Sequence, residues 1–404
     1  MSDVLVTGVG VVSAAGASFG ALSAALADGR ACGSTFETPL PLSRAGVVPV
    51  PIRPLPEFKD DRKAWLAMAA LEEALEDAGG TGDGRVSVFL GTGLSSVTPG
   101  ELEEDAYPHL CEDLTGFDRS ALLSDLAQDR AAPWRHDPAR VTSAVATRVG
   151  ATGPCGTSFS ACAAAAQAIA EGLRTLRRGE ADVAIVGGHD SMIHPFGILS
   201  FVVLGALSSD TCRPFDRHRD GFMIGEGAGI LVLERAEHAE ARGARARARL
   251  LGAGTSVDGF AATAPQPQGL GAEAAMRAAL KDAGLEPGVI DYVNAHATGT
   301  PVGDTAEAAA IAAVTPQARV SSIKGAIGHT IAAAGAIEAA ACIAALEGGF
   351  LPGTAGLSDP DPSVDLRLVS GVERRALQTV MSNSFGFGGQ NASLVFGHAR
   401  GVHG

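Results

Sequence analysis

The stretch ALEDAGGTGDGRVSVFLGTG, residues 74–93, recurs in outline as ALKDAGLEPGVIDYVNAHATGT, residues 279–300. In both, an expected helix ends in Ala-Leu-x-Asp-Ala-Gly and an apolar strand follows that opens into a Gly/Thr loop. The start, VLVTGVGVVSAAG (residues 4–16), likewise resembles ARLLGAGTSVDGF (residues 248–260). A period of about half the chain is too long for a solenoid. The pattern therefore predicts a duplicated unit.

The wider pattern of the chain predicts an α/β fold. Short β-branched runs alternate with Ala/Leu-rich segments of helical length, such as RKAWLAMAALEEALEDAGG at residues 62–80. Such alternation is typical of central strands covered by helices on both faces. The junction is expected in EHAEARGARARAR, residues 237–249. The predicted halves are therefore residues 1–244 and 245–404, in one compact body without a long linker.

Composition excludes several classes of protein. The formal net charge of −14 argues against a general nucleic-acid binder, which needs a basic surface. The six cysteines form no C-x-x-C pair, which argues against a disulfide framework or a zinc site and favours a reducing cytoplasm. The first residues lack the pattern of a signal peptide. The longest apolar stretches carry His329 and Glu338, unlike a membrane span. We expect a cytoplasmic protein.

Cys162 heads an alanine-rich run in TSFSACAAAAQAIA, residues 157–170. A lone cysteine in such a run is more commonly a small packing residue than a nucleophile. A helix N-terminus, however, offers free N–H groups and a positive dipole end, which favour a thiolate. Both interpretations stay open until partners for the thiol are found.

Two histidines supply candidate partners. His296 follows an apolar strand in VNAHATGTPVGDTAE, and His329 lies in SSIKGAIGHTIAAAGAIEAA with Lys324 before it and Glu338 after it. Strand ends of α/β sheets are where ligands bind. Each histidine alone is more commonly structural. A thiol in one half and two histidines in the other together favour a catalytic site.

A glycine-rich loop precedes the last strand, in NSFGFGGQNASLVF, residues 383–396. Gly386 and Gly388 flank Phe387 there. Glycines permit close approach of a main-chain N–H to a ligand. The loop is therefore either an ordinary turn or the source of an oxyanion-hole donor and a movable aromatic gate.

Together these motifs resemble those of the β-ketoacyl synthases, in the elongating class that condenses acyl chains on acyl carrier protein. The resemblance rests on SAC before a small-residue helix, CRPFDRHRDGFMIGEGAGILVLE, NAHATGTPVGD, KGAIGH and NSFGFGGQN, in order along the chain. It implies the thiolase fold, with two βαβαβαββ halves in a five-layered αβαβα body, usually dimeric.

The resemblance also assigns roles to residues. Cys162 matches the family's nucleophile, His296 and His329 its paired histidines, and Lys324 and Glu338 its supporting lysine and glutamate. The other implied roles are site-ordering acids at Asp304 and Glu307, pantetheine or substrate contacts at Thr298, Thr300 and Phe201, an oxyanion hole and gate at Cys162, Phe387 and Gly388, and carrier-protein docking through the basic residues Lys59, Arg62 and Lys63.

The implied reaction is a decarboxylative Claisen condensation of a cysteine-bound acyl chain with malonyl-acyl carrier protein. No metal or organic cofactor is expected, since the carrier protein brings the phosphopantetheine. We expect a homodimer, or alternatively the catalytic subunit of a heterodimer with a chain-length factor. A non-catalytic chain-length factor would lack the nucleophile, and a CoA thiolase would carry a second cysteine where this chain reads FGFGGQN. A dinucleotide-binding site lacks the required glycine spacing.

Four departures from the family pattern concern the substrate, of which one is the atypical sequence around Phe201 in residues 194–208. Ala297 replaces a usual glycine, Gln390 a common threonine, and residues 129–141 the usual apolar approach to the acyl pocket. They predict an unusual acyl chain, such as a polyene or polyketide.

Overall fold

The computed structural model describes residues 3–38, 40–55, 58, 61–93, 107–111, 116–128 and 137–399. Their strands form an eleven-stranded mixed sheet and two short two-stranded sheets. The first half of the chain contains β1 (Val4–Val12), α1 (Phe19–Ala27), β2 (Ser34–Thr35), β3 (Arg44–Ala45), α2 (Arg62–Ala78), β4 (Val86–Thr92), η2 (Tyr107–His109), α4 (Arg119–Ala127), α5 (Arg140–Arg148), β5 (Cys155–Ser158), η4 (Ala161–Ala163), α6 (Ala164–Arg177), β6 (Val183–Ser191), α7 (Pro195–Val203), β7 (Glu226–Arg235) and α8 (Ala236–Ala241).

The second half follows the same plan. It contains β8 (Ala248–Val257), α9 (Leu270–Ala283), η5 (Pro287–Val289), β9 (Tyr292–Asn294), α10 (Pro301–Val314), β10 (Arg319–Ser321), α11 (Lys324–Ile327), η6 (Ile331–Ala333), α12 (Ala334–Gly348), β11 (Phe350–Leu351), β12 (Arg367–Leu368), β13 (Glu373–Arg374), β14 (Thr379–Gly386), η7 (Phe387–Gly389) and β15 (Gln390–His398).

The order of the strands confirms the predicted duplication. The large sheet runs β12-β10-β9-β14-β15-β8-β1-β7-β6-β4-β5. The order β1-β7-β6-β4-β5 of the first half is repeated as β8-β15-β14-β9-β10 in the second, and the parallel and antiparallel pairings match strand for strand. The halves join where β1 pairs with β8. The predicted boundary falls between α8 and β8.

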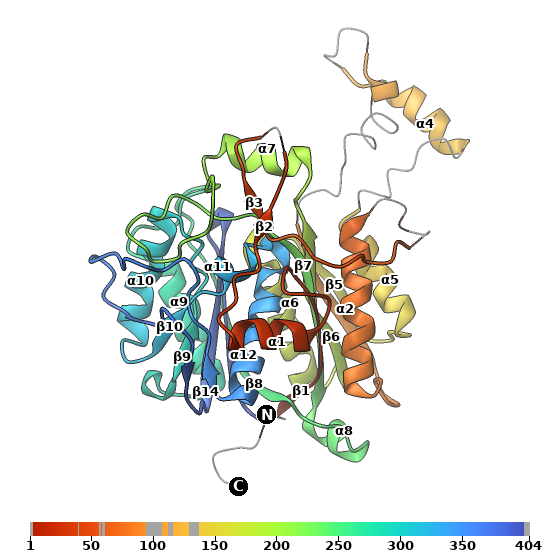
Figure 1. Cartoon of the computed structure of the whole chain (residues 1–404). Helices are drawn as coiled ribbons and strands as arrows, with labels where there is room; N and C mark the ends of the chain where they lie inside the picture. The colour runs from red at the N-terminus through yellow and green to blue at the C-terminus, as the bar shows by residue number, and fades with distance from the viewer. Residues whose placement is uncertain are drawn as a thin grey trace.

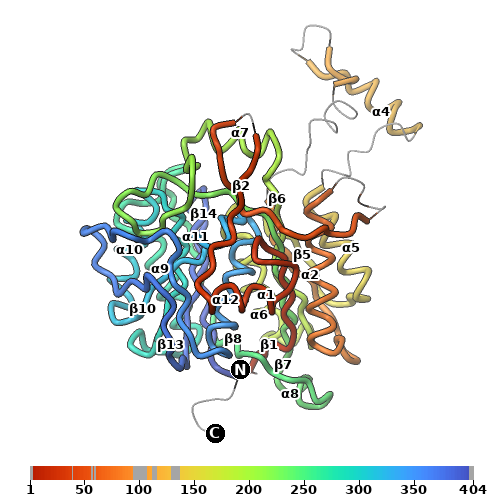
Figure 2. Tube along the Cα trace, in the orientation of Figure 1, coloured from red at the N-terminus to blue at the C-terminus, as the bar shows by residue number. Residues whose placement is uncertain are grey.

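Five layers result, as the resemblance implied (Figure 1). Helices α6 and α12 pack against each other between the two halves of the sheet, while α2 and α5 cover one outer face and α9 and α10 the other. The Cα trace shows the same order (Figure 2). The strands that lead to the candidate site residues end beside the N-termini of the two central helices.

Small residues let the central helix α6 lie against its sheet. A Cβ added to Gly91 of β4 would lie 2.3 Å from the backbone nitrogen of Ala165, and one on Gly188 of β6 would lie 2.7 Å from the Cβ of Ala165. Distances this short do not occur between packed atoms. The glycines and the alanine-rich start of α6 therefore set how deeply Cys162 is held in the body.

The second central helix, α12, forms most of a long apolar stretch. Within the described residues, Ile331–Gly348 is the only segment long and apolar enough to cross a membrane, with a mean hydropathy of 1.6. Inside the fold, 89% of it is buried. Its apolar character on all sides is thus explained by its place between the two halves of the sheet.

We predict that Gly91→Ala destabilises the protein, because the new methyl group would meet the backbone of α6. Overpacking of this kind costs about 1–3 kcal/mol. Urea unfolding followed by circular dichroism measures the loss. Gly288→Ala is the matched control, since nothing lies within 4 Å of the added Cβ. Equal unfolding midpoints for the two variants would contradict the packing argument.

Candidate active site

Cys162 lies in the short turn η4 that leads into α6, so it stands at the head of that helix as expected. The residue before it, Ala161, has a φ of 48°, and so does Ile331 at the matching place before α12. Non-glycine residues adopt this left-handed region only where their surroundings hold them there, commonly at functional sites. The duplication has therefore placed one constrained turn at the head of each central helix.

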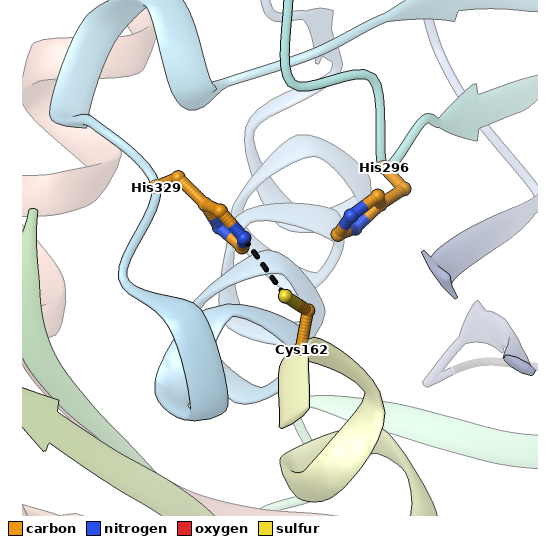
Figure 3. A group of neighbouring side chains, drawn as sticks. All are labelled: Cys162, His296 and His329. Carbon is orange, nitrogen blue, oxygen red and sulfur yellow. Dashed lines mark hydrogen bonds between the residues drawn. The ribbon is translucent and has the colours of Figure 1, made fainter. Parts of the chain in front are cut away.

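The thiol of Cys162 meets the second half of the chain at His329 (Figure 3). Its Sγ lies 3.1 Å from Nε2 of His329, which follows α11 and precedes η6. His296, just beyond β9, faces the same point: its ring is 5.3 Å from that of His329, at an interplanar angle of 86°. All three side chains are buried. The structure therefore places the predicted trio in one buried site.

Lys324 contacts the imidazole of His296 at Nδ1. Its Nζ lies 3.3 Å from Nδ1 of His296 and forms an ion pair with Glu338 of α12. An ammonium group can only donate hydrogen bonds, so Nδ1 of His296 accepts one and the ring proton is on Nε2. His296 is thereby fixed as a hydrogen-bond donor toward the thiol side of the site.

Burial sets the charge state of the trio. It holds the pKa of His296 and that of His329 well below the usual range, and the charge of Lys324 acts in the same direction. Burial also raises the pKa of Cys162 to about 12, which Lys324 and the N–H of Phe387 partly oppose. The resting site thus contains a neutral thiol and two neutral imidazoles, with Nε2 of His329 placed to take the thiol proton.

The two predicted acids order the backbone around His296. Glu307 accepts hydrogen bonds from the N–H groups of His296 and Ala297, at 2.8 and 2.7 Å. Asp304 accepts from the N–H groups of Phe215 and Gly299, at 2.8 and 3.1 Å. Both carboxyl groups are buried, and burial raises the pKa of Glu307 to about 7 and that of Asp304 to about 6.

A cavity of about 300 Å³ opens onto the trio. The predicted contact residues Phe201, Thr298, Thr300 and Phe387 all line it. A Cβ on Gly386 would lie 3.0 Å from the backbone nitrogen of Cys162, so a glycine there lets the loop approach the thiol closely. Gly388 has a φ of 75°, the left-handed region that favours glycine. The loop therefore brings the N–H of Phe387 close to the sulfur.

Two of the single-residue departures from the family pattern, Ala297 and Gln390, lie in different cavities. Ala297 lines the cavity, whereas Gln390 lies in a neighbouring groove where it accepts a 3.4 Å hydrogen bond from Gln167. Of the segment 129–141, residues 129–136 lie outside the described residues. Gln390 therefore lies outside the cavity that opens onto the trio.

One residue of the predicted docking surface, Lys63, needs correction. Lys63 is only 4% exposed, and its Nζ lies 3.9 Å from Oδ1 of the buried Asp190. Arg62 donates two hydrogen bonds of 2.6 Å to the buried Glu226. Lys63 faces inward because a buried carboxylate at the end of β6 attracts it, whereas the side chain of Arg62 remains 36% exposed and its docking role stays a prediction. Lys59 lies outside the described residues.

Three residues near the site were not predicted. Asp190 accepts a 3.1 Å hydrogen bond from the N–H of Ala332 and so holds the turn that follows His329. Asn383 donates to Glu307 at 3.2 Å, and the ring of Phe222 packs edge-on against that of His329, at 5.2 Å. Asn383 and Phe222 lie within motifs that the sequence did single out, whereas no pattern marked Asp190.

Comparison with known proteins identifies the family. The model of the β-ketoacyl synthase N-terminal domain matches residues 57–239, and that of the C-terminal domain matches residues 247–358. The 3-oxoacyl-[acyl-carrier-protein] synthase 2 of Staphylococcus aureus is 38% identical over 355 residues, which cover 83% of this chain and 84% of that protein.

Solved structures agree. The ishigamide ketosynthase/chain length factor is 34% identical with a TM-score of 0.84. A type II polyketide synthase ketosynthase, in complex with its acyl-carrier protein, is 28% identical with a TM-score of 0.87. Each match covers 99% of this chain and 100% of the other. The fold and the buried thiol-histidine site thus define a ketosynthase of the thiolase fold. The chain belongs to the β-ketoacyl synthase family.

We predict that Lys63→Met lowers stability, because it leaves the carboxylate of Asp190 buried without its cation. Removing one partner of a buried pair costs about 3–5 kcal/mol. Chemical unfolding measures the change, and Lys281→Met, at an exposed lysine of α9, is the control. An unchanged unfolding midpoint, combined with a raised KM only for carrier-bound thioesters, would restore the docking role.

Proposed function

We propose that the protein is a 3-oxoacyl-acyl carrier protein synthase in which Cys162 holds the growing acyl chain. The observation that carries this proposal is the 3.1 Å contact between Sγ of Cys162 and Nε2 of His329, with His296 facing the same point. The S. aureus relative bears the same activity in its name. The reaction has two half-reactions, which use these residues differently.

In the first half-reaction, the thiol attacks the carbonyl carbon of a carrier-bound acyl thioester. The thiol proton passes to Nε2 of His329 and then to the departing carrier thiolate, so the proton balance closes. The negative charge that develops on the carbonyl oxygen lies near the N–H groups of Cys162 and Phe387. These donors are fixed by the head of α6 and the glycine loop, as an oxyanion hole requires.

In the second half-reaction, a malonyl thioester binds with its thioester carbonyl between the two imidazoles. His296 donates from Nε2. His329 donates as well, because its Nδ1 has no hydrogen-bond partner among the described residues and the ring proton can be on either nitrogen. The bond to the terminal carboxylate breaks, CO₂ leaves, and the electron pair forms an enolate.

The enolate carbon then attacks the acyl-Cys162 carbonyl, the carbon–sulfur bond breaks, and the released thiolate takes up one proton from solvent water. Donors that strengthen as the oxygen gains charge accelerate this step, since they bind the transition state better than the substrate. Lys324 keeps His296 in the donating tautomer throughout. Glu307 and Asp304 position the backbone that carries His296 and the threonine loop.

The carrier protein supplies the substrates in this proposal. Thr298 and Thr300, whose hydroxyl groups lie 3.0 Å apart on the cavity wall, are proposed to contact the pantetheine arm. The ketosynthase neighbour that is bound to its acyl-carrier protein supports such a partner. The residues require no cofactor of their own for the steps above, and a cytoplasmic location remains part of the proposal.

A second assembly is favoured by a specific observation. The ishigamide structure pairs a ketosynthase with a chain length factor, so this chain could equally act as the catalytic subunit of a heterodimer. The contact between Cys162 and His329 argues against the non-catalytic role. A polyketide-like chain as substrate is supported by the type II polyketide synthase neighbour, whose ketosynthase is bound to a hexaketide.

We predict that Cys162→Ala abolishes both acylation and condensation. Intact mass spectrometry with a panel of acyl carrier protein thioesters detects the acyl adduct on the wild-type protein and its loss in the variant. Cys155→Ala, at an exposed cysteine, is the matched control and is expected to be acylated normally. Acylation of Cys162→Ala, or no acylation of the wild type by any thioester, would contradict the proposed function.

A further inference from the structure

The side chains of the catalytic trio are also of the types that ligate metal ions. The thiol of Cys162 and one nitrogen each from His296 and His329 all lie within 4.8 Å of one another, and all three side chains are buried. Thiolate sulfur and imidazole nitrogen are preferred ligands of Zn²⁺. Around a tetrahedral ion such atoms are roughly 3.5 Å apart, so ligation needs a contraction on the order of 1 Å at the widest pair.

The three ligands are not equally available. Nδ1 of His329 has no hydrogen-bond partner among the described residues, so this ring is free to carry its proton on Nδ1 and present the Nε2 lone pair. Nδ1 of His296, in contrast, faces the ammonium group of Lys324 at 3.3 Å. To ligate through Nε2, His296 would have to move its proton to Nδ1, where it would point at a positive charge.

We propose that Cys162, His329 and His296 form a latent site for a thiophilic divalent ion, Zn²⁺, and that Lys324 suppresses it by keeping the ring proton of His296 on Nε2. In the wild-type protein Cys162 and His329 alone ligate the ion, and binding is weak. The thiol proton is released to the buffer as the Zn–S bond forms. A bound ion occupies the place of the reacting thioester and blocks alkylation of Cys162.

The proposed suppression of metal binding by Lys324 can be tested separately from its part in the reaction, because metal binding is measured without substrate. A neutral side chain at position 324 frees Nδ1 of His296 to carry the proton. Because Glu338 is the buried partner of Lys324, the two charges must be removed together. The test variant is therefore Lys324→Met combined with Glu338→Gln, which leaves no unpaired buried charge.

The first experiment titrates Zn²⁺ against a chromophoric chelator, in a background where the exposed Cys111 and Cys155 are serine. The double variant is expected to bind Zn²⁺ about tenfold more tightly or better, the scale on which neighbouring groups alter metal affinity. His296→Ala is expected to remove that gain in the double variant and to change the affinity of the background protein little. No gain in the double variant, or a gain that survives His296→Ala, would overturn the proposal.

The second experiment uses the wild-type protein, so its result does not depend on whether the double variant folds. Co²⁺ added to the wild-type protein is expected to give a thiolate-to-metal absorption band that disappears in Cys162→Ala. Zn²⁺ is expected to slow iodoacetamide labelling of Cys162 while leaving the labelling rate of Cys155 unchanged, as followed by peptide mass spectrometry. Equal metal binding by the wild type and Cys162→Ala, or no protection of Cys162, would overturn the proposal and leave the proposed function untouched.

Discussion

The contact between the thiol of Cys162 and Nε2 of His329 depends on how two helices meet. Each is the central helix of one half-repeat, α6 or α12, and each begins beside the same point between the two halves of the sheet. Neither half contains the site alone, because the thiol comes from the first and both imidazoles from the second. The small residues along this meeting place allow the approach of 3.1 Å.

Buried charge is the second constraint. Lys324 and Glu338 are each about 1% exposed, and such a pair is tolerated only when both partners are present and well placed. The pair keeps the ring proton of His296 on Nε2. The same physical reasoning applies to Lys63 and Asp190. The carboxylate of Asp190 accepts a hydrogen bond from the N–H of Ala332, in the turn that follows His329, and the inward-facing Lys63 compensates its buried charge.

Most of the fold was predictable, because duplication repeats both the hydrophobic pattern and the turn residues. The repeated Ala-Leu-x-Asp-Ala-Gly segments marked equivalent helix ends, and the structure ends α2 and α9 with left-handed Gly79 and Gly284. The trio was predictable from its place at strand and helix ends together with a family resemblance. The inward direction of Lys63 was not, because periodicity places a residue on a helix face without saying whether a buried carboxylate lies opposite. The groove position of Gln390 likewise depends on the route of the chain around Gly388 and Gly389.

The central claim is that the thiol of Cys162 carries out acyl transfer, with His329 taking its proton, while both imidazoles stabilise the enolate. The most direct test measures the release of labelled CO₂ from malonyl-acyl carrier protein without any acyl donor. The account predicts that Cys162→Ala still releases CO₂ although it forms no product, and that His296→Ala releases far less than Cys162→Ala. CO₂ release that is lost in Cys162→Ala but retained in His296→Ala would contradict this division between the two halves of the chain.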